Sequence, residues 1–131
     1  KELTCLYGIA RATQQHEKPA DQLLRDVVEL LPPGWQYPEI TAARITLGGR
    51  TYATGGYNDS PWRQSAEIVV NGEKCGTVEV VYSESRPALD EGPFLKEERN
   101  LINAVAETIG VTLSYQTAQT ALRVPPLRVD P

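Results

Sequence analysis

The side chains best suited to chemistry in this chain are polar and charged residues on four predicted strands. Because side chains alternate between the two faces of a strand, one set of them should share a single sheet face. The set is Arg44, Thr46, Arg63, Ser65, Glu67, Thr77 and Glu79. These groups could hold a small polar or anionic ligand, with Tyr57 covering it from a neighbouring loop. The alternative is a solvated face whose cross-strand pair, Arg63 with Glu79, is worth only tenths of a kcal/mol.

The two tryptophans, Trp35 and Trp62, have two possible roles. Either could serve as a flat platform for a ligand, or it could pack in the core or between helices. With Trp62 included, the predicted binding site for an unidentified small ligand consists of Arg44, Tyr57, Trp62, Arg63, Glu67 and Glu79.

No catalytic or metal site is predicted. The single histidine, His16, lies between two predicted helices, with no cluster of cysteine, histidine or aspartate nearby, and is interpreted as a surface residue. Zinc or haem iron requires more ligands at metal-binding spacing. The glycine pairs at 48–49 and 55–56 lack the lysine and hydroxyl residue of a phosphate-binding loop, and no nucleophile elbow occurs. We therefore expect a non-enzymatic chain without metal or cofactor.

The elements that must position these residues follow from the spacing of apolar side chains. Helices are predicted over 2–15 and from Pro19 to Leu31, strands over 40–47, 50–54, 62–70 and 73–83, and a last helix from Pro93 to about Leu122. Residues 55–61 are a loop, because nearly all of them favour turns. Four antiparallel strands with helices on one face define an α+β domain.

The hairpin around Asn71-Gly72 has two possible registers. A two-residue turn pairs Ile68 with Cys75 and mixes polar and apolar residues on one face. A three-residue loop ending at Gly72 pairs Val69 with Glu73 and gathers the apolar residues on one face. We therefore predict the three-residue loop, which sets Arg63 opposite Glu79.

The last helix is long for its domain. From Pro93 to Leu122 it spans roughly 45 Å, whereas a compact domain of this size is about 30 Å across. Its second half carries almost no charge, which a solvated helix would normally have. A partner is expected there: the first helix of the same chain or the same helix of a second subunit. The predicted homodimer seam is Leu6, Ile109 and Leu113. A shorter helix with a frayed end is the alternative.

Length and charge limit the function further. The 131 residues are predicted to form one domain over 1–122, followed by a linker or tail over 123–131. A net charge of −4 with no basic run disfavours nucleic acid. No signal peptide or membrane span is recognised, and Cys5 and Cys75 are interpreted as independent thiols in a reducing cytoplasm, although a disulfide stays open. The chain lacks Met at its start, which suggests a piece of a longer protein.

Three segments resemble the GAF-like sensor regions of bacterial signalling proteins, histidine kinases especially. They are 33–39 (PGWQYPE), 70–74 (VNGEK) and 90–99 (DEGPFLKEER). The resemblance implies a cytoplasmic input domain, often dimeric through its terminal helices, with a pocket over one sheet face and an output domain joined to the same chain. The loop at 55–61 is shorter than the insertion of nucleotide- or tetrapyrrole-binding relatives, and it lacks the cysteine and histidine of bilin attachment. A ligand-free dimerisation module attached to another output, such as a transcriptional regulator or a metabolic enzyme, is the alternative.

Overall fold

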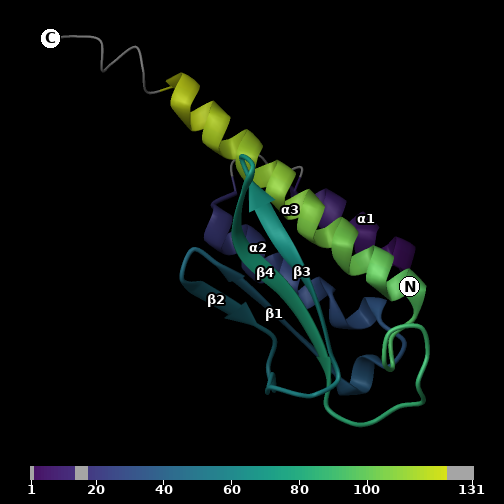
Figure 1. Ribbon diagram of the computed structural model, residues 1–131. Coiled ribbons are helices and arrows are strands. Elements are labelled where there is room, and N and C mark those ends of the chain that lie inside the picture. The colour runs from purple at the N-terminus through teal and green to yellow at the C-terminus, as the bar shows by residue number, and fades with distance from the viewer. Residues whose placement is uncertain (1, 14–17, 124–131) are drawn as a thin grey trace, which may run out of the picture.

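The computed structural model describes residues 2–13 and 18–123 (Figure 1). In chain order the elements are α1 (Glu2–Thr13), α2 (Ala20–Leu30), two short 3-10 helices η1 (Pro32–Gly34) and η2 (Pro38–Ile40), β1 (Thr41–Leu47), β2 (Arg50–Ala53), β3 (Arg63–Val70), β4 (Glu73–Tyr82) and α3 (Lys96–Arg123). His16 and the predicted tail beyond Arg123 lie outside the described residues.

Four strands form one antiparallel sheet in the order β2-β1-β4-β3. The two hairpins, β1-β2 and β3-β4, join through the β1-β4 pair at the centre of the sheet. The helices α1, α2 and α3 lie on one side of this sheet, with α2 against β1 and β2 and α3 against β3 (Figure 1). The predicted α+β architecture is confirmed.

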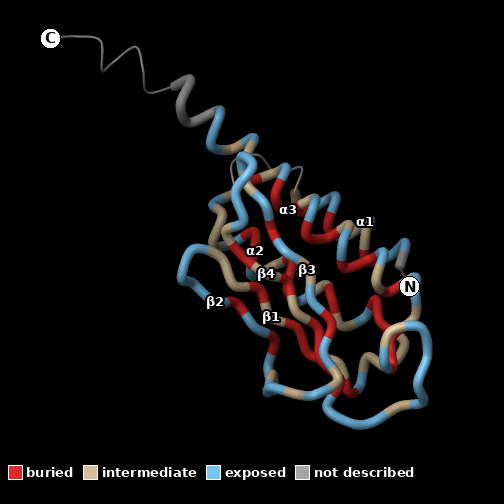
Figure 2. The backbone as a smooth tube through the Cα atoms, in the orientation of Figure 1, coloured by how far each residue is buried: buried red, intermediate tan, exposed pale blue. Residues whose placement is uncertain are grey.

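The core lies between the sheet and the helices, where the tube in Figure 2 is red. Alternation along the strands points one apolar set inward: Ala43, Ile45, Ile68, Val78, Val80 and Tyr82. The amphipathic spacing of α2 buries Leu23, Leu24, Val27 and Val28 against them. Trp35, which follows η1, is fully buried, and its indole N–H donates to Gln64 Oε1 at 3.1 Å.

The β3-β4 hairpin corrects the predicted register. Asn71 and Gly72 both have positive φ, 53° and 82°, so they form a two-residue turn and Val70 pairs with Glu73. The predicted three-residue loop is wrong. The apolar residues of the hairpin nevertheless stay on one face. A β-bulge shifts the register between the Val69–Lys74 pair and the Ile68–Gly76 pair, so Cys75 of β4 has no partner residue in β3. One extra residue restores the alternation that the short turn would otherwise reverse.

Helix α3 covers the outer edge of β3, an edge strand of the sheet. At one end of the strand Arg99 Nη1 donates to the carbonyl of Ser65 at 2.8 Å, and at the other Ser114 Oγ accepts the Asn71 N–H at 3.1 Å. Between these contacts Gly110 brings the helix backbone against the carbonyl oxygen of Val69. Covering an edge in this way protects it from pairing with other chains.

The predicted long last helix is confirmed. α3 has 28 residues, about 42 Å of helix, and Figure 1 shows its C-terminal part running beyond the end of the sheet. It begins at Lys96 rather than Pro93, because Glu91 and Phe94 form a β-bridge just before it. Within the described ranges, none of the helices is both long and apolar enough for a membrane span.

An ion pair between Arg99 in the first turn of α3 and Glu91 in the preceding loop predicts a pH effect. Arg99 donates to both carboxylate oxygens of Glu91, at 2.8 and 2.7 Å, and these bonds lower the pKa of Glu91. Since the folded-state pKa is below the unfolded one, the pair stabilises the fold above the unfolded pKa of about 4.3 and loses its contribution as the pH falls through the folded pKa. We expect Glu91→Gln to lower the free energy of unfolding at neutral pH by less than about 1 kcal/mol, since both side chains are partly exposed.

Urea denaturation at pH 7, 5 and 3 checks this prediction, because the difference between wild type and Glu91→Gln should shrink towards acidic pH. Glu67→Gln is the matched control, since its pair with Lys74 is longer, 3.3 Å, and more exposed. If the difference in stability between wild type and Glu91→Gln is the same at pH 3 as at pH 7, the ion pair is not its cause.

Candidate functional site

The sheet face that the helices leave uncovered carries the predicted polar set. The register places Glu79 of β4 between Arg44 of β1 and Ser65 of β3, and Thr77 opposite Glu67. Arg63 lies opposite Val81, so its predicted position opposite Glu79 is wrong by two residues along β4. The two-residue turn accounts for one residue of this shift, and the bulge in β4 accounts for the other.

Arg44 and Glu79 form the centre of this face. Arg44 donates to Glu79 through Nε at 2.8 Å and Nη2 lies 2.7 Å from the same oxygen, while Arg63 Nη1 approaches the other oxygen at 3.7 Å. The hydrogen bond to Glu79 raises the pKa of Arg44. Glu79 therefore neutralises Arg44, and an anion bound here would have to replace that carboxylate.

The ring of Tyr57 packs against Arg44. The guanidinium lies 4.6 Å from the centre of the tyrosine ring, which is a cation–π contact, and Asp59 of the same loop reaches Arg44 at 4.0 Å. The Tyr57 hydroxyl is buried and has no hydrogen-bond partner in the described part of the chain. Burial, followed by the negative charge of Glu79, raises the pKa of this phenol.

The structure brings four of the six predicted ligand-binding residues together: Arg44, Tyr57, Arg63 and Glu79. Trp62 is half-buried and packs against the core. Glu67 lies farther along β3 and pairs with Lys74. The two remaining residues therefore do not belong to the cluster around Arg44.

A hollow of about 410 Å³ lies beside this cluster, between the loop of residues 54–62 and the sheet. We call it the loop hollow. Its lining comprises Glu39, Ile40, Thr41, Ala42, Gly55, Gly56, Asn58, Asp59, Ser60, Pro61, Trp62, Val81 and Ser83. Of the described residues, two carboxylates and no basic side chain line the hollow, so its charge favours a neutral or cationic occupant over an anion.

Sequence reasoning missed the loop hollow except for Trp62. A signal was present in the sequence: Ala42 and Val81 are apolar residues at positions that alternation assigns to the otherwise polar face. The structure shows that both are buried and that they pair with each other across β1 and β4. A buried apolar pair on an exposed face indicates that something covers it. The 54–62 loop is that cover.

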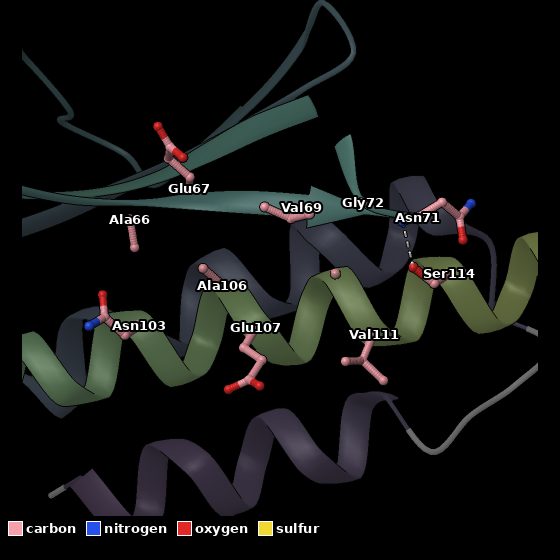
Figure 3. Close-up of a pocket in the computed structure, with 11 residues that line it drawn as sticks. Ala66, Glu67, Val69, Asn71, Gly72, Asn103, Ala106, Glu107, Val111 and Ser114 are labelled. Carbon is pink, nitrogen blue, oxygen red and sulfur yellow. Dashed lines mark hydrogen bonds between the residues drawn. The ribbon is translucent and has the colours of Figure 1, made fainter. Parts of the chain in front are cut away.

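A second depression, of about 550 Å³, lies between β3 and α3 (Figure 3). Its wall includes Ala66, Val69 and Ala106, with Glu67, Asn103 and Glu107 among the polar residues. Figure 3 shows Glu107 and Val111 projecting from the side of α3 away from β3, so they do not converge with Glu67 on a common point. No acid–base arrangement results.

The predicted dimer seam needs a correction. Ile109 is fully buried and Leu113 is 8% exposed, and both belong to the domain's own core, while Leu6 packs partly against it. Among the residues of α1 and α3 whose burial is described, the exposed large apolar side chains are different: Leu3 and Tyr7 on α1, and Val111 and Tyr115 on α3. A one-dimensional pattern does not distinguish the helix stripe that faces the sheet from the neighbouring stripe that faces outward.

The two cysteines are separate thiols in the structure. Burial raises the pKa of the Cys5 thiol to about 11, so it stays protonated and unreactive at neutral pH. Among the residues that the structure places, no group of three histidine, cysteine, aspartate or glutamate side chains could hold a metal ion.

No family model matches this chain, and no curated protein or solved structure is significantly similar to it. The class of the protein is therefore defined by its fold: an α+β domain with a four-stranded antiparallel sheet, three helices on one face and a long exit helix. The similarity of three sequence segments to GAF domains stays a prediction.

Proposed function

We propose that this chain is a non-catalytic sensory or regulatory input domain, similar to GAF domains, that signals through α1 and α3. One observation carries the proposal. α3 extends past its own sheet (Figure 1), and no charged residue occurs between Glu107 and Arg123. A helix exposed to water on most of its surface would normally carry charges, so this part is suited to contact with protein.

The proposed contact is a homodimer interface on the outward side of α1 and α3. The two helices pack against each other, and Leu3, Tyr7 and Val111 expose 82%, 67% and 64% of their surface. A second copy fits this surface because exposed apolar side chains can pack against their own counterparts across a two-fold axis. An exit helix held in such a dimer would pass a change of position to an output domain joined to the chain, which we propose is a cytoplasmic histidine kinase.

The proposed input is a small molecule in the loop hollow. Its volume is at the lower end of ordinary ligand sites, and it combines an apolar floor with hydroxyl and carboxylate groups on its wall. Arg44 and Glu79 are already paired with each other, so we place the ligand beside that cluster rather than on it. A ligand-free dimerisation module attached to another output is the second candidate, supported by the same helices.

Sedimentation equilibrium tests the dimer. We expect the wild-type chain to sediment at about twice its mass of 14.4 kDa and Val111→Glu to sediment as a monomer, because the substitution would bury an unpaired charge in the interface. Leu89→Glu is the control, since Leu89 is also an exposed apolar residue but lies in the loop between β4 and α3. A monomeric wild type at the highest soluble concentration, or a dimeric Val111→Glu, would refute the proposed interface.

A further inference from the structure

Glu98 is a buried carboxylate that joins three separate segments. It is 2% exposed, and no lysine or arginine in the described part of the chain forms an ion pair with it. One oxygen accepts the N–H of Leu95 at 2.8 Å, which caps the start of α3. The other accepts the N–H of Gln36 at 2.8 Å and lies 3.5 Å from the hydroxyl of Tyr82 in β4.

The two segments bonded to Glu98 also form one side of the loop hollow. Val81 and Ser83, the chain neighbours of Tyr82, line the hollow, as do residues 39–41, which follow Gln36 by a few positions. Since side chains alternate along a strand, β4 presents Val81 to the hollow and Tyr82 to Glu98 on the opposite face. Strand β4 therefore lies directly between the loop hollow on one face of the sheet and Glu98 on the other.

Further contacts connect the wall of the hollow into one unit. The Ser83 N–H donates to the carbonyl of Ile40 at 2.9 Å, and the Thr41 hydroxyl donates to the carbonyl of Tyr37 at 2.6 Å. The rings of Tyr37 and Tyr82 pack edge to face at 5.6 Å. These bonds tie residues 37–41 to β4, so a displacement on the hollow side is transmitted to both groups that bind Glu98.

We infer that Glu98 couples the loop hollow to α3, so that filling the hollow moves the first turns of the exit helix. This inference rests on the proposed function, in which the hollow is the input and α3 the output. Glu98 acts as a positioning residue. Separating it from Gln36 or Leu95 would leave a buried carboxylate or N–H without a partner, so the wall and the helix start move together more readily than apart.

The test uses a side chain in place of the unknown ligand. Ala42 lines the floor of the hollow, and Ala42→Leu fills part of it. The readout is hydrogen exchange at the amides of residues 101–105, in the first turns of α3. We expect Ala42→Leu to change these exchange rates about fivefold or more, the lower end of ordinary coupling between sites. Thr46→Leu is the matched control on the same face of β1, because Thr46 does not line the hollow.

The same comparison in a Glu98→Gln background tests the residue itself. Glutamine preserves the shape but removes the charge, and we expect Ala42→Leu to leave the exchange of residues 101–105 unchanged there. An equal effect with and without Glu98 would show that the coupling does not pass through it. Tyr82→Phe, which removes only the hydroxyl, should weaken the effect and serves if Glu98→Gln does not fold.

The inference and the proposed function fail in different ways. If Ala42→Leu and Thr46→Leu leave α3 equally unaffected while the chain sediments as a dimer, the coupling is wrong and the dimer interface stands. If Ala42→Leu alters α3 through Glu98 in a chain that is monomeric, the coupling stands and the proposed output surface is refuted.

Discussion

Gly110→Ala is expected to destabilise the domain by about 1–3 kcal/mol, although alanine is the better helix former by about 1 kcal/mol. A Cβ atom on Gly110 would overlap the backbone carbonyl oxygen of Val69. Backbone cannot move aside as a flexible side chain does, so α3 would have to retreat from β3. The flanking contacts at Ser65 and Asn71 would lengthen with it.

Gly8→Ala is the matched control, because it makes the same substitution in the middle of another helix. A Cβ atom there would lie 3.2 Å from the end of the Leu30 side chain, which can turn away. We expect this variant to be neutral or more stable than wild type. Urea denaturation of both variants is the measurement, and equal stabilities for Gly110→Ala and wild type would show that α3 is not held against β3 at this point.

Trp35→Ala is expected to lower the free energy of unfolding by about 3–5 kcal/mol, the usual range for a buried aromatic side chain. Trp35 is fully buried, and it packs where the segment after η1 meets the sheet. Trp35→Phe preserves most of the ring volume but removes the donor to Gln64, a buried side chain. That loss alone should cost about 1–3 kcal/mol, because Gln64 Oε1 would lose its partner.

Trp62→Ala provides the comparison for the other tryptophan. Trp62 is only partly buried and lines the loop hollow, so its loss should destabilise the domain less than Trp35→Ala. Thermal or urea unfolding followed by far-UV circular dichroism measures all three variants without relying on tryptophan emission. A larger loss for Trp62→Ala than for Trp35→Ala would mean that the sheet is anchored by the loop rather than by the segment after η1.

The hairpin shows where local pattern reasoning fails. The sequence contains the Asn71-Gly72 signal of a two-residue turn, and the apolar alternation on both sides is equally clear. These two signals conflict unless one strand contains an extra residue. The structure resolves the conflict with a bulge at Cys75 in β4. The turn and the apolar alternation are both local signals, and neither says which strand takes the extra residue.

The candidate site shows the same limit. Strand alternation was sufficient to place Arg44, Arg63 and Glu79 on one face, and turn chemistry to place Tyr57 above them. Whether Arg44 would be available to bind a ligand depended on how close its side chain comes to Glu79 on the neighbouring strand. Glu79 bonds Arg44 directly, so the open volume lies next to the cluster, under the loop.

The sequence by itself determined the α+β class, the identity of the strands and the long exit helix, because apolar spacing and turn residues act over a few positions along the chain. Only the tertiary structure decided which stripe of α3 is core and which is exposed, since Ile109 and Val111 differ by two positions but face opposite environments. It also decided that Glu98, Gln36 and Tyr82 meet. Contacts between residues distant along the chain depend on how the elements pack, and no local period records that packing.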